Sequence, residues 1–102
     1  MLDLTVPLAE DELFVKFGDW TSGTSTISAV GNMRMYSLQS TIDSASNAVV
    51  VASTSAFSDG LLLTADVDAI KPGRQIQLNV EVKIPAGTIG GGYSTTYDFE
   101  SR

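Results

Sequence analysis

The sequence predicts an all-β fold, a single antiparallel β-sandwich of about eight short strands. The first observation is the stretch 75–84, where apolar and polar residues alternate without a break. A period of two places one set of side chains on a buried face and the other in solvent, as in a half-buried strand. The second is a similar alternation over 93–99, after a glycine-rich turn. The third is that no window repeats apolar residues at helical spacing.

Four strands are expected in the first half of the chain. Residues 2–6 alternate between apolar and polar and end at a proline, which cannot donate to a strand ladder. Residues 13–17 alternate again and end at a Gly-Asp pair. Residues 26–30 end at a Gly-Asn pair, which is a turn signal. Residues 33–42 are apolar on both parities, so they predict a strand whose register stays open.

Four more strands are expected in the second half. Residues 48–52 form a continuous β-branched run, which is typical of a central strand covered on both faces. Residues 61–67 alternate apart from one leucine. The strand over 75–84 ends at Pro-Ala-Gly, and the strand over 93–99 follows. Short strands bounded by Gly, Pro, Asn, Asp or Ser are typical of immunoglobulin-like or jelly-roll-like sandwiches.

Composition excludes several classes of function. The 102 residues suit one domain, 1–102, and the net charge is −6 with only six scattered Lys and Arg residues. Nucleic acid and anionic membranes are therefore not expected as partners. The absence of His and Cys removes thiolate chemistry, Ser-His-Asp triads and most zinc sites. Paired carboxylates remain, but so small a domain has little room for a glycosidase cleft, and we expect no enzyme.

Neither a membrane span nor an export signal is expected. No stretch approaches the about 20 apolar residues of a transmembrane helix. The opening residues 1–7 alternate as a strand does and carry no basic region of the kind that begins a signal peptide. The chain is expected either to act without export or to be the mature part of an exported protein.

Three aspartates are candidates for a cation site. Asp66 and Asp68 lie two residues apart on the polar face of a predicted strand, and Asp59 lies just upstream. Adjacent carboxylates at a strand end can bind Ca²⁺, which would be the only cofactor expected. The full D-x-[DN]-x-[DN]-G calcium loop is absent. The alternative interpretation is solvated acids that discourage edge-to-edge aggregation.

Trp20, the only tryptophan, is the candidate for a ligand or partner contact. A tryptophan in an exposed loop can stack on a sugar or anchor an interface. With Tyr93 or Tyr97 it would suit a carbohydrate-binding module. The alternative is that Trp20 folds back and closes one end of the sandwich.

Three stretches resemble a group of bacterial surface β-sandwich modules that includes the WxL-type and spore-coat-U-type modules. They are the opening 4–7, the turn 84–88 and the tail 92–99. The chain has neither a WxL triplet nor the cysteine pair of the spore-coat-U modules. The resemblance implies a non-catalytic β-sandwich that serves as a subunit or spacer in an extracellular assembly.

The hypothesis from the sequence is a non-enzymatic structural subunit that assembles with copies of itself or with a larger capsid or surface lattice. The preferred form is a virion protein of a phage or virus, such as a coat, head-decoration or tail component. A bacterial or archaeal cell-surface filament or adhesin module is the alternative. Terminal strands are the simplest to pair with a neighbour's open sheet edge. The expected assembly residues are Leu2, Leu4, Val6, Tyr93, Tyr97 and Phe99.

Overall fold

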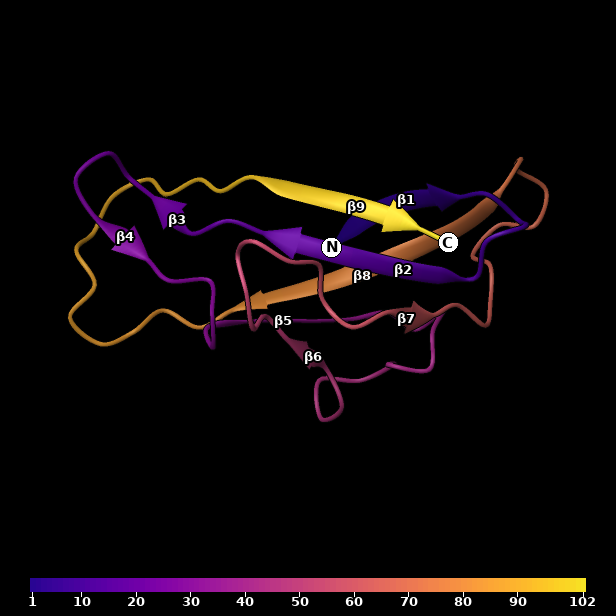
Figure 1. Ribbon diagram of the computed structural model, residues 1–102, viewed down its shortest axis with the longest axis horizontal. Coiled ribbons are helices and arrows are strands. Elements are labelled where there is room, and N and C mark those ends of the chain that lie inside the picture. The colour runs from indigo at the N-terminus through magenta and orange to yellow at the C-terminus, as the bar shows by residue number, and fades with distance from the viewer.

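The computed structural model describes residues 1–102, and its regular secondary structure consists entirely of strands (Figure 1). It contains no helix that could cross a membrane. The strands are β1 (Leu2–Val6), β2 (Glu12–Phe17), β3 (Trp20–Thr21), β4 (Thr26–Ile27), β5 (Met33–Tyr36), β6 (Val49–Val50), β7 (Leu61–Leu62), β8 (Arg74–Val82) and β9 (Tyr97–Ser101).

The strands form two main sheets and one small hairpin, and every pairing is antiparallel. One sheet has the order β1-β8-β5-β6 and the other the order β7-β2-β9, while β3 and β4 pair with each other. The prediction of an all-β fold built from antiparallel sheets is therefore confirmed.

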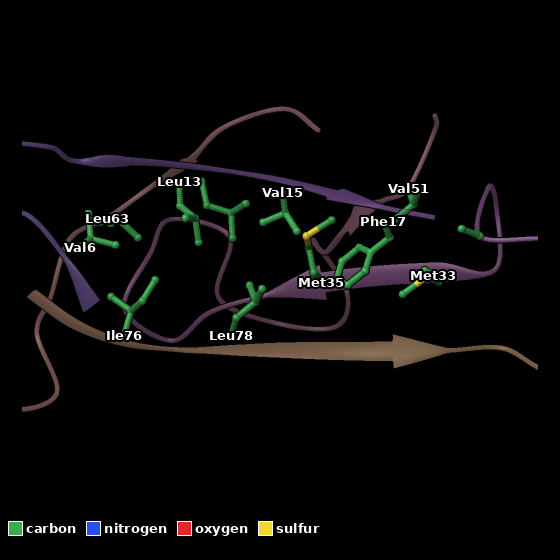
Figure 2. Packing of buried hydrophobic residues seen from close by; sticks show 12 residues of the cluster. Val6, Leu13, Val15, Phe17, Met33, Met35, Val51, Leu63, Ile76 and Leu78 are labelled. Carbon is green, nitrogen blue, oxygen red and sulfur yellow. The ribbon is translucent and has the colours of Figure 1, made fainter. Parts of the chain in front are cut away.

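The hydrophobic core lies between the two main sheets. Figure 2 shows side chains of β2 pointing toward those of β5 and β8 across this space. The cluster of buried side chains consists of Val6, Leu13, Val15, Phe17, Ala29, Met33, Met35, Val51, Leu61, Leu63, Ile76 and Leu78. Each sheet thus buries one face, because residues two apart along a strand point to the same side.

The longest strand, β8, is the stretch of strict alternation that the sequence singles out. Its Ile76 and Leu78 side chains are fully buried. It pairs with β1 on one edge, with Leu4 opposite Ile76, and with β5 on the other. The apolar half of the alternation is therefore the part of β8 that faces the core, as expected for a half-buried strand.

The structure settles the register of the expected strand 33–42. Met33 and Met35 face the core, and β5 covers only the first four residues of the range. The remainder is a turn around Ser37 and Ser40, which are both buried. The Ser40 hydroxyl donates to the Ser37 carbonyl oxygen at 2.9 Å. Such local side-chain bonds compete with the ladder, which is why the strand stops.

The expectation of a central strand over 48–52 is wrong. The strand β6 lies at the edge of its sheet and pairs only with β5. Val51 is buried, whereas Val50 is exposed. A β-branched run suits an edge strand as well as a central one, so composition does not distinguish the two positions.

The last strand begins later than expected. Residues 93–96 lie beside β2 and β3 without forming a regular strand. Ser94 forms an isolated bridge with Thr21, and the Gly18 N–H donates to the Thr96 carbonyl oxygen at 2.9 Å. Regular pairing with β2 starts only at Tyr97. The β3–β4 hairpin and the segment 83–96 extend one end of an elongated molecule of 45 × 25 × 22 Å (Figure 1).

Candidate functional site

Two strand edges without partners lie along the same side of the molecule. Strand β1 is the last strand of the four-stranded sheet, and β9 is the last strand of the three-stranded sheet. Figure 1 shows both along one long side, with no strand beyond them. Unpaired strand edges present a row of backbone donors and acceptors to a further strand.

The opposite side of the two sheets is closed by backbone hydrogen bonds. The Thr41 N–H donates to the Leu62 carbonyl oxygen at 2.9 Å, which ties the turn after β5 to β7. The Ser58 N–H donates to the Val15 carbonyl oxygen at 2.8 Å, which places the segment before β7 alongside β2. On the side with β1 and β9, no backbone hydrogen bond joins the two sheets.

A cleft of about 390 Å³ opens on this side. Two tyrosines from the end of the chain face apolar residues of the first strands and of β8 across it. Its polar side chains besides the tyrosines are Ser94 and Thr95. The principal lining residues are Leu2, Phe17, Trp20, Val80, Tyr93 and Tyr97. The cleft is thus an aromatic and aliphatic surface with few hydrogen-bonding groups.

Tyr97 forms an accessible part of the cleft. It pairs in register with Phe17, and their ring centroids lie 6.3 Å apart at an interplanar angle of 56°. Its ring centroid lies 5.1 Å from that of Phe99. Tilted aromatic pairs at these distances are favourable, so Tyr97 is held in place. It nevertheless remains 51% exposed and leaves an aromatic face for a partner.

Trp20 combines the two roles that the sequence leaves open. It is half-buried and packs against the core, and its indole Nε1–H donates to the Met33 sulfur at 3.2 Å. It lies in strand β3, where a loop was expected. One part of the side chain therefore closes the end of the core, while another lines the cleft.

The expected assembly residues do not all reach the surface. Leu2 and Leu4 are half-buried and pack against the core, and Phe99 does the same from the other sheet. Val6 is only 2% exposed. The expectation that the Val6 side chain contacts a partner is therefore wrong, because a side chain already enclosed by its own core has no free surface. Tyr93 lines the cleft, and its hydroxyl donates to the Ile89 carbonyl oxygen.

The three candidate calcium ligands are not brought together. The Asp66 Oδ1 accepts the N–H groups of Asp68, at 3.0 Å, and Gln75, at 2.9 Å. The Asp68 Oδ1 accepts the Ile70 N–H at 3.1 Å. Asp59 lies apart from them, beside the hollow between β2 and β6, and the structure holds no cluster of three metal-ligating side chains. Asp66 and Asp68 thus stabilise the turn into β8, a common role of aspartate.

The cleft also contains residues that sequence reasoning did not assign to it. Val80 and Val82 come from the end of β8, and Met1 precedes β1. The alternation in β8 places both valines on the inward face. It does not show that the facing three-stranded sheet leaves them partly uncovered. The missing information is the position of β9, which is a property of the sheet order.

No protein-family model, curated protein or solved structure matches this chain. The function therefore has to be inferred from the open edges and the cleft between them.

Proposed function

We propose that the protein is a non-enzymatic structural subunit that assembles with copies of itself or with a larger partner. The observation that supports this proposal is the pair of unpaired strand edges, β1 and β9, on either side of an open aromatic cleft. Natural proteins usually cover or blunt such edges because they are templates for pairing with another chain.

The chemistry of the cleft favours a protein partner. Aromatic side chains are enriched at the centres of protein interfaces, where they supply a large contact area at low entropic cost. Tyr97 and Met1 expose apolar surface at the mouth of the cleft, and Trp20 and Phe17 form its interior. A partner's apolar side chain would complete the burial of these groups.

Within this function, we favour a phage or virus virion protein that acts as a coat, head-decoration or tail component. An acidic chain without His or Cys suits a subunit whose task is binding within a lattice. The alternative is a filament or adhesin module of a bacterial or archaeal cell surface. Both forms require the same property, which is a side of the subunit that stays incomplete until a neighbour binds.

Self-association is the first property to measure. Light scattering on a sizing column, across a concentration series, is expected to show a mass that rises from one chain to a defined oligomer. The physical reason is that each copy buries an open edge and apolar surface of the cleft on assembly. A mass of one chain at every concentration would contradict self-assembly and leave only a larger partner.

Carbohydrate binding is the second candidate, because Trp20, Tyr93 and Tyr97 line one cleft. If it is right, a glycan array will show binding by the native protein. Tyr97→Ala is expected to weaken that binding at least about tenfold, since stacking on a sugar would be lost. Trp20→Ala should abolish it, but Trp20 also packs against the core, so the Tyr97 variant is the cleaner test. Absence of glycan binding by the native protein would contradict this candidate.

A further inference from the structure

We infer that β1 pairs antiparallel with β1 of a second copy, around a twofold axis that passes beside Leu4. This inference rests on the proposed function and names its partner and its edge. The pairing would join the two four-stranded sheets into one continuous sheet across the axis. Such an interface is isologous, so it closes as a dimer and leaves no further β1 edge free.

The charge pattern of β1 fits this pairing. With Leu4 opposite its own copy, Asp3 lies opposite Thr5 of the second copy, and Thr5 lies opposite Asp3. Neither cross-strand pair sets two carboxylates against each other, because each pair carries only the one negative charge of Asp3. On the inward face, Leu4 lies opposite its own copy, while Val6 contributes only its backbone because its side chain is already enclosed.

An antiparallel pairing of β9 with β9 of a second copy, around a similar twofold axis, is unfavourable. Centring the pair on Phe99 places Asp98 opposite Glu100 of the second copy, twice. Like charges directly opposite each other on neighbouring strands are destabilising. Of the two open edges, β1 is therefore the one suited to its own copy.

The register also accounts for exposed apolar residues beyond the strand. Met1 would lie opposite Pro7 of the second copy, with Leu8 just beyond it. Met1 is 73% exposed and Leu8 is 65% exposed. Because Met1 lines the aromatic cleft, this pairing brings Leu8 of each copy to the mouth of the other copy's cleft. The dimer thus supplies an apolar occupant for the cleft from the same chain.

The decisive experiment compares dimer dissociation constants by sedimentation equilibrium. Thr5→Asp places an acid opposite Asp3 at both ends of the pair, and is expected to raise the dissociation constant about tenfold. The charge swap Asp3→Lys with Thr5→Asp opposes lysine to aspartate instead. It is expected to return the dissociation constant to the native value or below it. The circular dichroism of each variant checks that the monomer remains folded.

A matched pair of surface variants tests the second contact. Leu8→Ser is expected to raise the dissociation constant about tenfold, because apolar burial at the cleft is lost. Leu38→Ser removes the same kind of side chain, 67% exposed, from the turn after β5 on the opposite side of the sheets, so it should leave the constant unchanged.

Two results would overturn the inference, and they differ in what they say about the function. If the native protein associates but Thr5→Asp leaves the dissociation constant unchanged, or the charge swap fails to restore it, the subunit assembles through another surface. If the native protein stays monomeric at every concentration, both the β1 dimer and self-assembly fail.

Discussion

Leu61→Ala is expected to lower the free energy of unfolding by about 2–5 kcal/mol, whereas Leu62→Ala should cost less than about 1 kcal/mol. The two leucines are neighbours in β7, which pairs with β2 through Leu13 and Glu12. Leu61 is 0% exposed and belongs to the core cluster, while Leu62 is 44% exposed. Truncating Leu61 removes apolar contacts and leaves a cavity, since the surrounding side chains relax only partly. Urea denaturation of both variants measures the difference.

The comparison controls for sequence position and for chemistry, because the residue type, the substitution and the strand are the same. Equal losses at the two positions would contradict the assignment of Leu61 to the inward face. The register of β7 against β2 would then need revision, since a slip of one residue moves every side chain of a strand to the other face.

Gly73→Ala is expected to destabilise the protein by about 2–4 kcal/mol, and Gly31→Ala by about 1–2 kcal/mol. Both glycines have a φ of +77°, where an L-residue with a Cβ is strained. They differ in the space around them. A Cβ at Gly73 would lie 2.8 Å from the Thr5 Cγ2 and 3.2 Å from the Val6 carbonyl oxygen, whereas nothing lies within 4 Å at Gly31. Thermal or urea unfolding of the two variants measures both losses. Their difference is the cost of the steric clash at Gly73, because the cost of the positive φ is common to both.

A second substitution identifies the source of the extra cost at Gly73. Thr5→Ser removes the methyl group nearest the new Cβ, so Gly73→Ala should cost less in that background. The Val6 carbonyl oxygen remains, and part of the difference from Gly31 should persist. If Gly73→Ala and Gly31→Ala destabilise equally, β1 does not approach the turn before β8 as closely as the structure shows.

The sequence pattern predicts individual strands well where one face is buried. In β8 the alternation identifies Ile76 and Leu78 as core residues, and in β2 it identifies Leu13, Val15 and Phe17. These assignments follow from the side-chain period of a strand, which is a local property. The pattern fails at 48–52, where the run of valines belongs to an edge strand, because composition does not report how many neighbours a strand has.

The candidate site could be predicted only in part. The aromatic residues Trp20, Tyr93 and Tyr97 stand out in the sequence as candidates for contact with a ligand or partner. That they line one cleft with Val80 and Met1 depends on which strands end each sheet. The aspartates show the opposite outcome. Their spacing suggested a cation site, but the structure holds no cluster of three metal-ligating side chains, and the Oδ1 atoms of Asp66 and Asp68 accept backbone N–H groups.

The sequence by itself determined the fold class, the inward face of the longer strands and the absence of His and Cys chemistry. These properties depend on residue type and on a period of two along the chain, both of which are local. The tertiary structure alone decided that β1 and β9 end their sheets on the same side, that Val6 is enclosed, and that an aromatic cleft opens between the edges. Those features depend on the order of strands, which is set by contacts between residues far apart in the chain.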